Sequence, residues 1–201
     1  NTMELKNMKV VDMEVPKNSK EAGSSKLAHK WRAAERTEME QLYDKGCLVA
    51  VRREDIPAGQ KVIPGMMVYA AKGDADGMLR KFKARFVAKG FYQREGIDFI
   101  ATYAPVATYT SIKMIISTAA HLGLKAFQFD VEGAFLLPDI ELPLYSSDEH
   151  GNCYLCYKTL YGLKQSANAW NRELHNELTA LGMTQSVIDP CVYTRLTKDG
   201  W

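Results

Sequence analysis

The sequence has few of the features that mark membrane, secreted or disordered proteins. Its 201 residues include only four cysteines, and no apolar run reaches the roughly 18 residues that a membrane span needs. Sparse cysteines favour a reduced, intracellular setting over a disulfide framework. A net charge of +2 is too small to predict a partner by itself. The signature motifs of P-loop nucleotide-binding proteins, dinucleotide-binding dehydrogenases, zinc proteases and serine hydrolases are also absent.

What is present suits a folded domain. A hydrophobic content of 46% can fill a core, and a charged content of 25% argues against both disorder and low complexity. Residues 1–24 are polar and rich in helix breakers, which predicts a linker before a domain that spans residues 25–201. Apolar spacing then predicts helices from about residue 25 to Gly46 and over 110–122 and 166–181. Shorter patterns predict strands over 61–71, 79–89, 125–131 and 191–196. The class indicated is α+β, with helices packed on an antiparallel sheet.

One predicted helix carries an apolar stripe. Ile112, Ile115, Ile116 and Ala119 recur at helical spacing in 110–122, with Thr108 or Thr110 as the N-cap and Gly123 at the end. This spacing predicts a buried helix face.

Positive charge gathers in one stretch of the chain. Residues 72–94 hold seven basic and two acidic residues. In the strand 79–89, Lys81, Lys83 and Arg85 alternate with apolar side chains, so one face is basic and the other apolar. A basic strand face suits a polyanion such as a phosphate chain. The alternative is a solvated edge strand that carries lysines to resist aggregation.

Asp130 follows a run of aromatic residues and ends the predicted strand 125–131. A carboxylate at the end of a buried strand needs a cation or a hydrogen-bond donor. A divalent metal is one partner for it. The alternative is that Asp130 caps a helix that begins within Val131–Leu137.

Two further segments have competing interpretations. In Leu160–Ser166, Gly162 permits a close backbone approach, while Lys164 and Gln165 could donate to phosphate near a helix N-terminus; the alternative is an ordinary strand-to-helix turn. Cys153 and Cys156 form a single C-x-x-C. With no second pair and no suitably spaced histidines, buried thiols on or beside a strand are favoured over a zinc or redox site.

Taken together, these segments resemble copia-type retrotransposon reverse transcriptases. The resemblance rests on Lys83–Gln93, Gly96–Phe99, Thr102–Val106, Asp130–Leu136 and Leu160–Ser166 with Trp170, which stand in the order and at the spacing of that family. The helix with Trp31, Ala34 and Glu38 is similar to the leading helix of the family. The similarity covers about residues 15–196.

The resemblance implies a fold and a chemistry. It implies the fingers and part of the palm of a right-hand polymerase, within a Pol polyprotein that also holds integrase and RNase H regions. The reaction would be RNA-directed DNA synthesis on an RNA or DNA template with a primer, through two Mg²⁺ ions. Asp130 would bind both ions with the Val131 carbonyl, and Lys83 and Arg85 would meet the incoming deoxynucleoside triphosphate.

Other residues gain roles by the same resemblance. Phe135 would disfavour a 2′-hydroxyl, and the segment with Gly162, Lys164 and Gln165 would line the nucleotide and template side. Cytoplasmic particles or the nucleus would be the location, without a membrane.

The paired aspartates of the family, Y-x-D-D, would follow the last predicted strand. The chain reaches Trp201 first, after a turn signal at Lys198–Gly200. We therefore expect a truncated domain that does not hold the two ions by itself and is inert in primer extension. The alternative function is a non-catalytic nucleic-acid-binding remnant of such an element.

Overall fold

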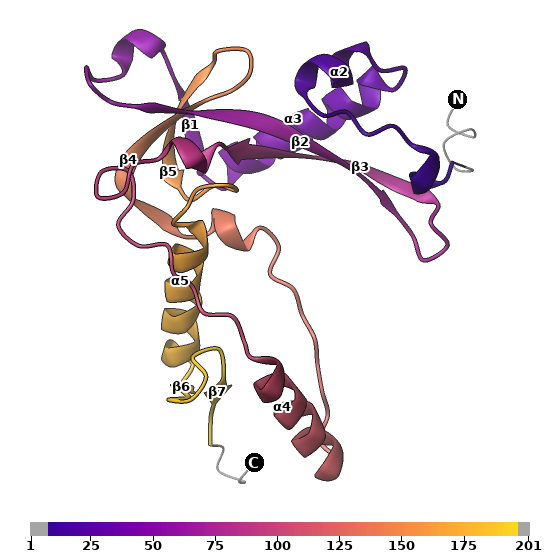
Figure 1. Cartoon of the computed structure of the whole chain (residues 1–201), viewed down its shortest axis with the longest axis vertical. Coiled ribbons are helices and arrows are strands. Elements are labelled where there is room, and N and C mark those ends of the chain that lie inside the picture. Colours follow the sequence, from indigo (N-terminus) through magenta and orange to yellow (C-terminus); the bar gives the residue numbers. More distant parts are fainter. Residues whose placement is uncertain (1–7, 197–201) are drawn as a thin grey trace.

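A curled five-stranded sheet organises the computed structural model, which describes residues 8–196 and has a mixed α+β fold (Figure 1). The sheet has the order β1-β5-β4-β2-β3. Its strands are β1 (Leu48–Val51), β2 (Val62–Gly73), β3 (Leu79–Ala88), β4 (Asp139–Ser147) and β5 (Cys153–Lys158). β2 and β4 are parallel and the other neighbours antiparallel, so the expectation of an antiparallel sheet is wrong for one pair. A parallel pair needs a long connection, and residues 74–138, which include β3, provide it.

Four α-helices accompany the sheet in the described part of the chain. They are α2 (Ser19–Ser24), α3 (Ala28–Asp44), α4 (Tyr109–His121) and α5 (Ser166–Ala180), followed by a small hairpin of β6 (Thr184–Gln185) and β7 (Tyr193–Thr194). The three long helices are confirmed. Thr108 caps α4 by accepting the Ser111 amide, whereas α2 lies inside the segment predicted as a linker. None of the described helices combines the length and the apolar character that a membrane crossing requires.

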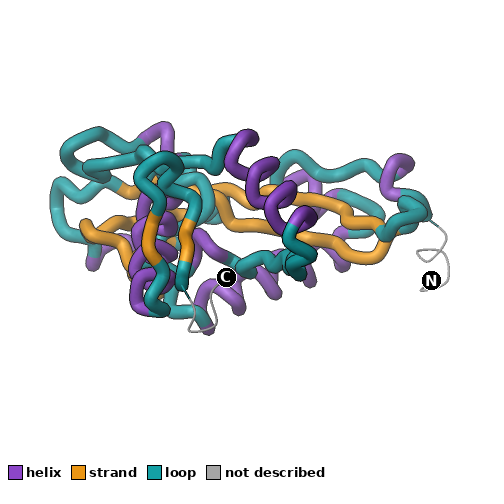
Figure 2. Tube along the Cα trace, turned by 90° about the horizontal axis from the view of Figure 1, so that it is seen from below, coloured by secondary structure: helices purple, strands orange, loops and turns teal. Residues whose placement is uncertain are grey.

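The basic hairpin forms as the alternation predicts. β2 pairs with β3 from Gly65 to Gly73, and the two strands extend as a long arm beyond the rest of the sheet (Figure 2). Ala84, Phe86 and Ala88 are buried, whereas Lys83 and Arg85 on the opposite face are half-buried. β2 also runs through Pro64–Gly65 without a break. Gly65 permits this because its missing side chain leaves room for the Phe86 ring.

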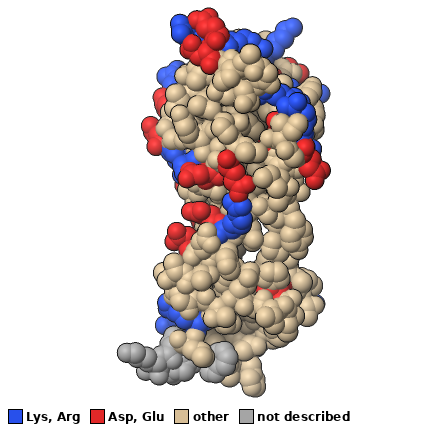
Figure 3. Space-filling view, turned by 90° about the vertical axis from the view of Figure 1, so that its left-hand side faces the viewer, with Lys and Arg blue, Asp and Glu red and all other residues tan. Residues whose placement is uncertain are grey.

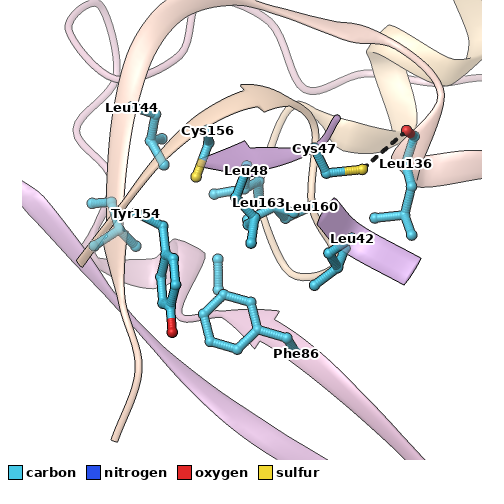
Figure 4. Packing of buried hydrophobic residues seen from close by; sticks show 12 residues of the cluster. Leu42, Cys47, Leu48, Phe86, Leu136, Leu144, Tyr154, Cys156, Leu160 and Leu163 are labelled. Carbon is cyan, nitrogen blue, oxygen red and sulfur yellow. Dashed lines mark hydrogen bonds between the residues drawn. The ribbon is translucent and has the colours of Figure 1, made fainter. Parts of the chain in front are cut away.

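Two apolar clusters stabilise the part of the molecule that contains α2, α3 and the five-stranded sheet. In the smaller one, Trp31 of α3 is fully buried and meets Tyr69 and Phe82 edge to face, at centroid distances of 5.4 and 4.7 Å. The larger cluster packs α3 against the strands of the sheet and against the loop segments next to those strands (Figure 4). Its buried members are Leu42, Cys47, Leu48, Ile63, Phe86, Ala88, Leu136, Leu144, Tyr154, Cys156, Leu160 and Leu163.

Two predictions are wrong, one for α4 and one for the segment that follows it. Residues 125–131 form no strand, and Phe127 and Phe129 are about 85% exposed. The predicted buried stripe of α4 is exposed at Ile112, Ile115 and Ile116. Strand pairing and helix burial both require a neighbouring surface, and the described residues supply none here. Figure 1 shows the segment after α4 running alone back to the sheet.

The last predicted strand is short. Of residues 191–196, only Tyr193 and Thr194 are in a strand, and the turn at Lys198–Gly200 lies outside the described residues. Asp189 is the residue that ties this end of the chain to α4. It is 3% exposed, and its carboxylate accepts the amides of Thr108 and Cys191 at 2.9 Å each.

A close backbone approach fixes the segment before α5 against β3. The Ala88 amide donates to the Tyr161 carbonyl at 2.8 Å, which adds a short parallel bridge at the edge of the sheet. Gly162 has a φ of +86°, and a β-carbon there would overlap the Ala88 carbonyl and the Val87 side chain. Gly90 faces the Gly162 carbonyl at a distance that leaves no space for a side chain either.

Replacing Gly162 with alanine tests this approach. We expect Gly162→Ala to lower the free energy of unfolding by roughly 3 kcal/mol or more, because a left-handed backbone and a steric overlap both oppose the methyl group. Gly151→Ala is the matched control, with φ +89° and open space around its β-carbon. Its cost should be about 1 kcal/mol. Equal losses for the two variants in urea denaturation would show that the close approach is absent.

Acid titration tests the role of Asp189. Hydrogen bonds, led by that of Ser111, lower the pKa of this carboxyl to about 2 from its ordinary value of 3.8. Since the folded-state pKa is the lower one, the carboxylate stabilises the fold fully above about pH 4 and loses that effect towards pH 2. Wild type should therefore lose stability over this window, and Asp189→Asn should lose less. Parallel curves of unfolding free energy against pH for the two proteins would refute this.

Candidate functional site

A hollow of about 230 Å³ lies between α3, the basic face of β3 and the chain that returns from α4. Five of the site residues predicted from sequence line it. Lys83 and Arg85 come from β3, and Asp130, Val131 and Phe135 come from the returning chain. The full lining is Glu38, Gln41, Lys83, Arg85, Asp130, Val131, Glu132, Gly133, Ala134, Phe135 and Tyr161. We call this hollow the basic-strand cavity.

The two cations of the cavity are free of carboxylate partners. Neither Lys83 nor Arg85 forms an ion pair within 4.0 Å anywhere in residues 8–196. The Arg85 guanidinium instead lies over the face of Tyr161, 5.5 Å from its centroid. A guanidinium on an aromatic ring keeps its charge and its donors available for an anion.

Asp130 lies in the cavity, but not in the structural setting that the sequence predicts for it. It belongs to an exposed segment without regular secondary structure, so it does not end a buried strand. It does not cap a helix either. The nearest helical turn is the 3₁₀ turn Ala134–Leu136, whose N-cap is Gly133 with φ +68°. The exposed carboxylate of Asp130 faces a cavity lined by Lys83 and Arg85, with Val131 beside it.

Phe135 is held firmly at the edge of the cavity. Thr159 donates its hydroxyl to the Phe135 carbonyl at 2.6 Å, and the Cys47 thiol donates to the Leu136 carbonyl at 3.5 Å (Figure 4). Leu136 is buried in the larger cluster. The Phe135 ring meets Tyr161 edge to face, with centroids 6.3 Å apart.

The other three predicted residues form a second group. Gly162, Lys164 and Gln165 do not line the cavity, although Tyr161, next to Gly162, does. Gln93, which is 5% exposed, organises them: its side chain accepts the Lys164 amide and donates to the Gln165 side chain, at 2.9 Å each. The Lys164 amide is therefore already used and is not available to a phosphate. The ammonium of Lys164 lies 4.9 Å from the centroid of Phe99.

Glu38 is a cavity residue to which the sequence pattern gave no role. It lies on the buried face of α3, is 6% exposed and accepts the Phe86 amide at 3.2 Å. Burial raises the pKa of this carboxyl, and the Phe86 amide with Arg85 and Lys83 opposes the rise only in part. Its spacing of seven residues from Trp31 is the signal that places it on the buried face.

The cysteines are buried thiols. Cys153 and Cys156 both lie on β5, are free and are buried, as expected. Burial raises the pKa of Cys156 to about 12, which keeps it protonated at neutral pH. The structure therefore gives no support to a redox or zinc role for the C-x-x-C pair.

Charge is unevenly distributed over the surface. Figure 3 shows most basic and acidic side chains on the upper body, while the lower part of that face is largely uncharged. Over residues 8–196, no group of three or more histidine, cysteine, aspartate or glutamate side chains is arranged to hold a metal ion.

Comparison of the sequence with known proteins relates the chain to one family, and the matched segment includes residues of the cavity. The model of the reverse transcriptase (RNA-dependent DNA polymerase) family matches residues 50–200. The chain belongs to this family. The match includes β3, Asp130 and Phe135, whereas Glu38 on α3 lies before it.

The chain is similar to Pol polyproteins of plant transposons. The retrovirus-related Pol polyprotein from transposon TNT 1-94 of Nicotiana tabacum is 35% identical over 193 residues, which is 92% of this chain and 14% of the relative. Those from transposons RE1 and RE2 of Arabidopsis thaliana are 35% and 33% identical over 145 residues, or 68% of the chain and 10% of each relative. The chain is thus a reverse transcriptase region of the copia type that spans a small part of these relatives. No solved structure matches it.

Substitutions at Glu38 test its buried charge. Because the folded-state pKa is above the ordinary value of 4.5, stability should fall as the pH rises through 4.5 and on through the raised pKa. Glu38→Gln removes this loss and should be more stable than wild type at pH 7. Glu38→Leu leaves the Phe86 amide unpaired and should be less stable than Glu38→Gln by about 1–3 kcal/mol. A Glu38→Gln variant less stable than wild type at pH 7 in urea denaturation would show that the buried carboxylate does not destabilise the fold.

Proposed function

We propose that the basic-strand cavity binds the incoming deoxynucleoside triphosphate in RNA-directed DNA synthesis. One observation carries the proposal: Lys83 and Arg85, which form no ion pair within residues 8–196, line a cavity with Asp130 and with Phe135, whose backbone carbonyl is held by Thr159. The membership of the chain in the reverse transcriptase family supports it.

The arrangement suits both the triphosphate and the sugar of a deoxynucleotide. A triphosphate carries several negative charges, and a guanidinium with an ammonium on one strand face can bind them through charged hydrogen bonds. Phe135, which also lines the cavity, is an apolar surface against which a deoxyribose can pack. Its bulk would disfavour a ribose, whose 2′-hydroxyl needs both space and a polar partner.

A divalent metal, Mg²⁺ by family resemblance, would be bound by the Asp130 carboxylate with the Val131 carbonyl, and would supply charge neutralisation for phosphoryl transfer. Two ions need more carboxylates than the described residues gather, since no cluster of three metal-ligating side chains exists among them. The residues present do not complete a two-metal site. We therefore expect nucleotide binding without primer extension from this chain.

The rest of the domain receives roles by the same proposal. The sheet with α3 would form the fingers of a right-hand polymerase, and α4 with α5 part of the palm, within a domain of residues 25–201 after a linker. The second group, Gly162, Lys164 and Gln165, would line the template side. The partners would be a template with a primer, and integrase and RNase H regions of the same polyprotein. Cytoplasmic particles or the nucleus would be the location.

Charge removal on the basic strand tests the proposal. Lys83→Gln and Arg85→Gln should each weaken the binding of dATP by roughly tenfold, because each removes one charged hydrogen bond to phosphate. Lys81→Gln is the matched control, since Lys81 lies on the same strand but does not line the cavity. Equilibrium dialysis with labelled dATP provides the measurement. Equal weakening in all three variants would show a non-specific charge effect and would rule out this cavity.

A further inference from the structure

Tyr161 touches both functional walls of the basic-strand cavity. The face of its ring lies under the Arg85 guanidinium at 5.5 Å, and its ring meets that of Phe135 at 6.3 Å with an interplanar angle of 76°. It also lines the cavity itself, and it comes from a third segment, the turn between β5 and α5. One side chain therefore sets where the phosphate-binding cation and the sugar-facing ring lie relative to each other.

The backbone of Tyr161 makes this position rigid. Its carbonyl accepts the Ala88 amide at 2.8 Å, and the adjoining Gly162 packs directly on the β3 backbone. Leu160, on its other side, is fully buried in the larger cluster. Because the backbone on both sides of Tyr161 is held in this way, its ring has little freedom to move. The positions of Arg85 and Phe135 therefore follow from the position of the ring.

An aromatic ring can orient the Arg85 guanidinium without neutralising its charge. A carboxylate close enough to fix the guanidinium would neutralise it and compete with phosphate. Glu38, the buried carboxylate of the same cavity, makes no ion pair with Arg85 within 4.0 Å in the described structure and instead accepts the Phe86 amide. Stacking on Tyr161 orients the guanidinium and leaves its charge in place.

We propose that Tyr161 is a positioning residue that holds Arg85 and Phe135 at a fixed separation, and so sets both the affinity for triphosphate and the preference for deoxyribose. The inference rests on the proposed function of the cavity. Tyr161 itself is assigned no contact with the reacting atoms.

The test uses dATP and ATP as probes, because they differ only at the 2′-position, with the whole chain in equilibrium dialysis. We expect Tyr161→Phe to bind both as wild type does, since it keeps the ring. Tyr161→Leu should bind dATP roughly 3- to 10-fold more weakly and lose part of the preference for dATP over ATP. Rescue by phenylalanine separates ring positioning from the hydroxyl group.

Arg85→Lys provides an independent arm that does not require Tyr161→Leu to fold. It keeps the charge but loses the planar group, so it should weaken dATP binding about as much as Tyr161→Leu does. In the double variant Tyr161→Leu with Arg85→Lys, the second change should add little, because both remove one stacking contact. Lys83→Arg is the matched control and should be insensitive to the residue at 161.

The outcomes separate the two proposals. If wild type binds neither nucleotide, the proposed function of the cavity fails and the role of Tyr161 falls with it. If wild type binds dATP and either a folded Tyr161→Leu or Arg85→Lys binds it equally well, only the role of Tyr161 is overturned. Loss of dATP binding in Tyr161→Phe would also overturn it, since the stacking ring is retained there.

Discussion

The contact between the Tyr161–Gly162 backbone and the edge of β3 is the constraint on which the rest of the structure depends. It brings together two segments that are more than seventy residues apart, through one amide-to-carbonyl bond and a site where only glycine fits. This contact joins the start of α5 to the basic strand, and the ring of Tyr161 in the same segment meets Phe135 of the 3₁₀ turn. A side chain at Gly162 would push these elements apart, and with them the walls of the cavity.

The cavity combines charge and rigidity in an unusual way for a protein surface. Exposed cations usually pair with acids at little net gain, yet Lys83 and Arg85 have no such partner in residues 8–196. The acids nearby are arranged differently: Glu38 is buried against a backbone amide, and Asp130 lies on the returning chain. This separation leaves the two cations facing two exposed carboxylates, those of Asp130 and Glu132, which is an arrangement that suits a metal-bound polyphosphate better than a structural ion pair.

The sequence predicted the local features and missed those that depend on tertiary neighbours. The long helices and the basic hairpin follow from periodicity, and the grouping of Lys83, Arg85, Asp130 and Phe135 follows from family resemblance. The strand at 125–131 and the buried face of α4 were wrong, because apolar spacing indicates what a segment could bury and not whether a partner is present. The roles of Glu38 and Gln93 were not predicted, because a buried polar residue shows its role only through the amides and side chains that it meets.

Chemical-shift mapping of backbone amides during a titration with dATP tests the central claim most directly. We expect the shifts to concentrate at residues 83–86, 130–136 and 160–162, which surround the basic-strand cavity. Shifts confined to the Gln93–Gln165 group, or spread evenly over exposed lysines, would contradict the assignment of nucleotide binding to this cavity.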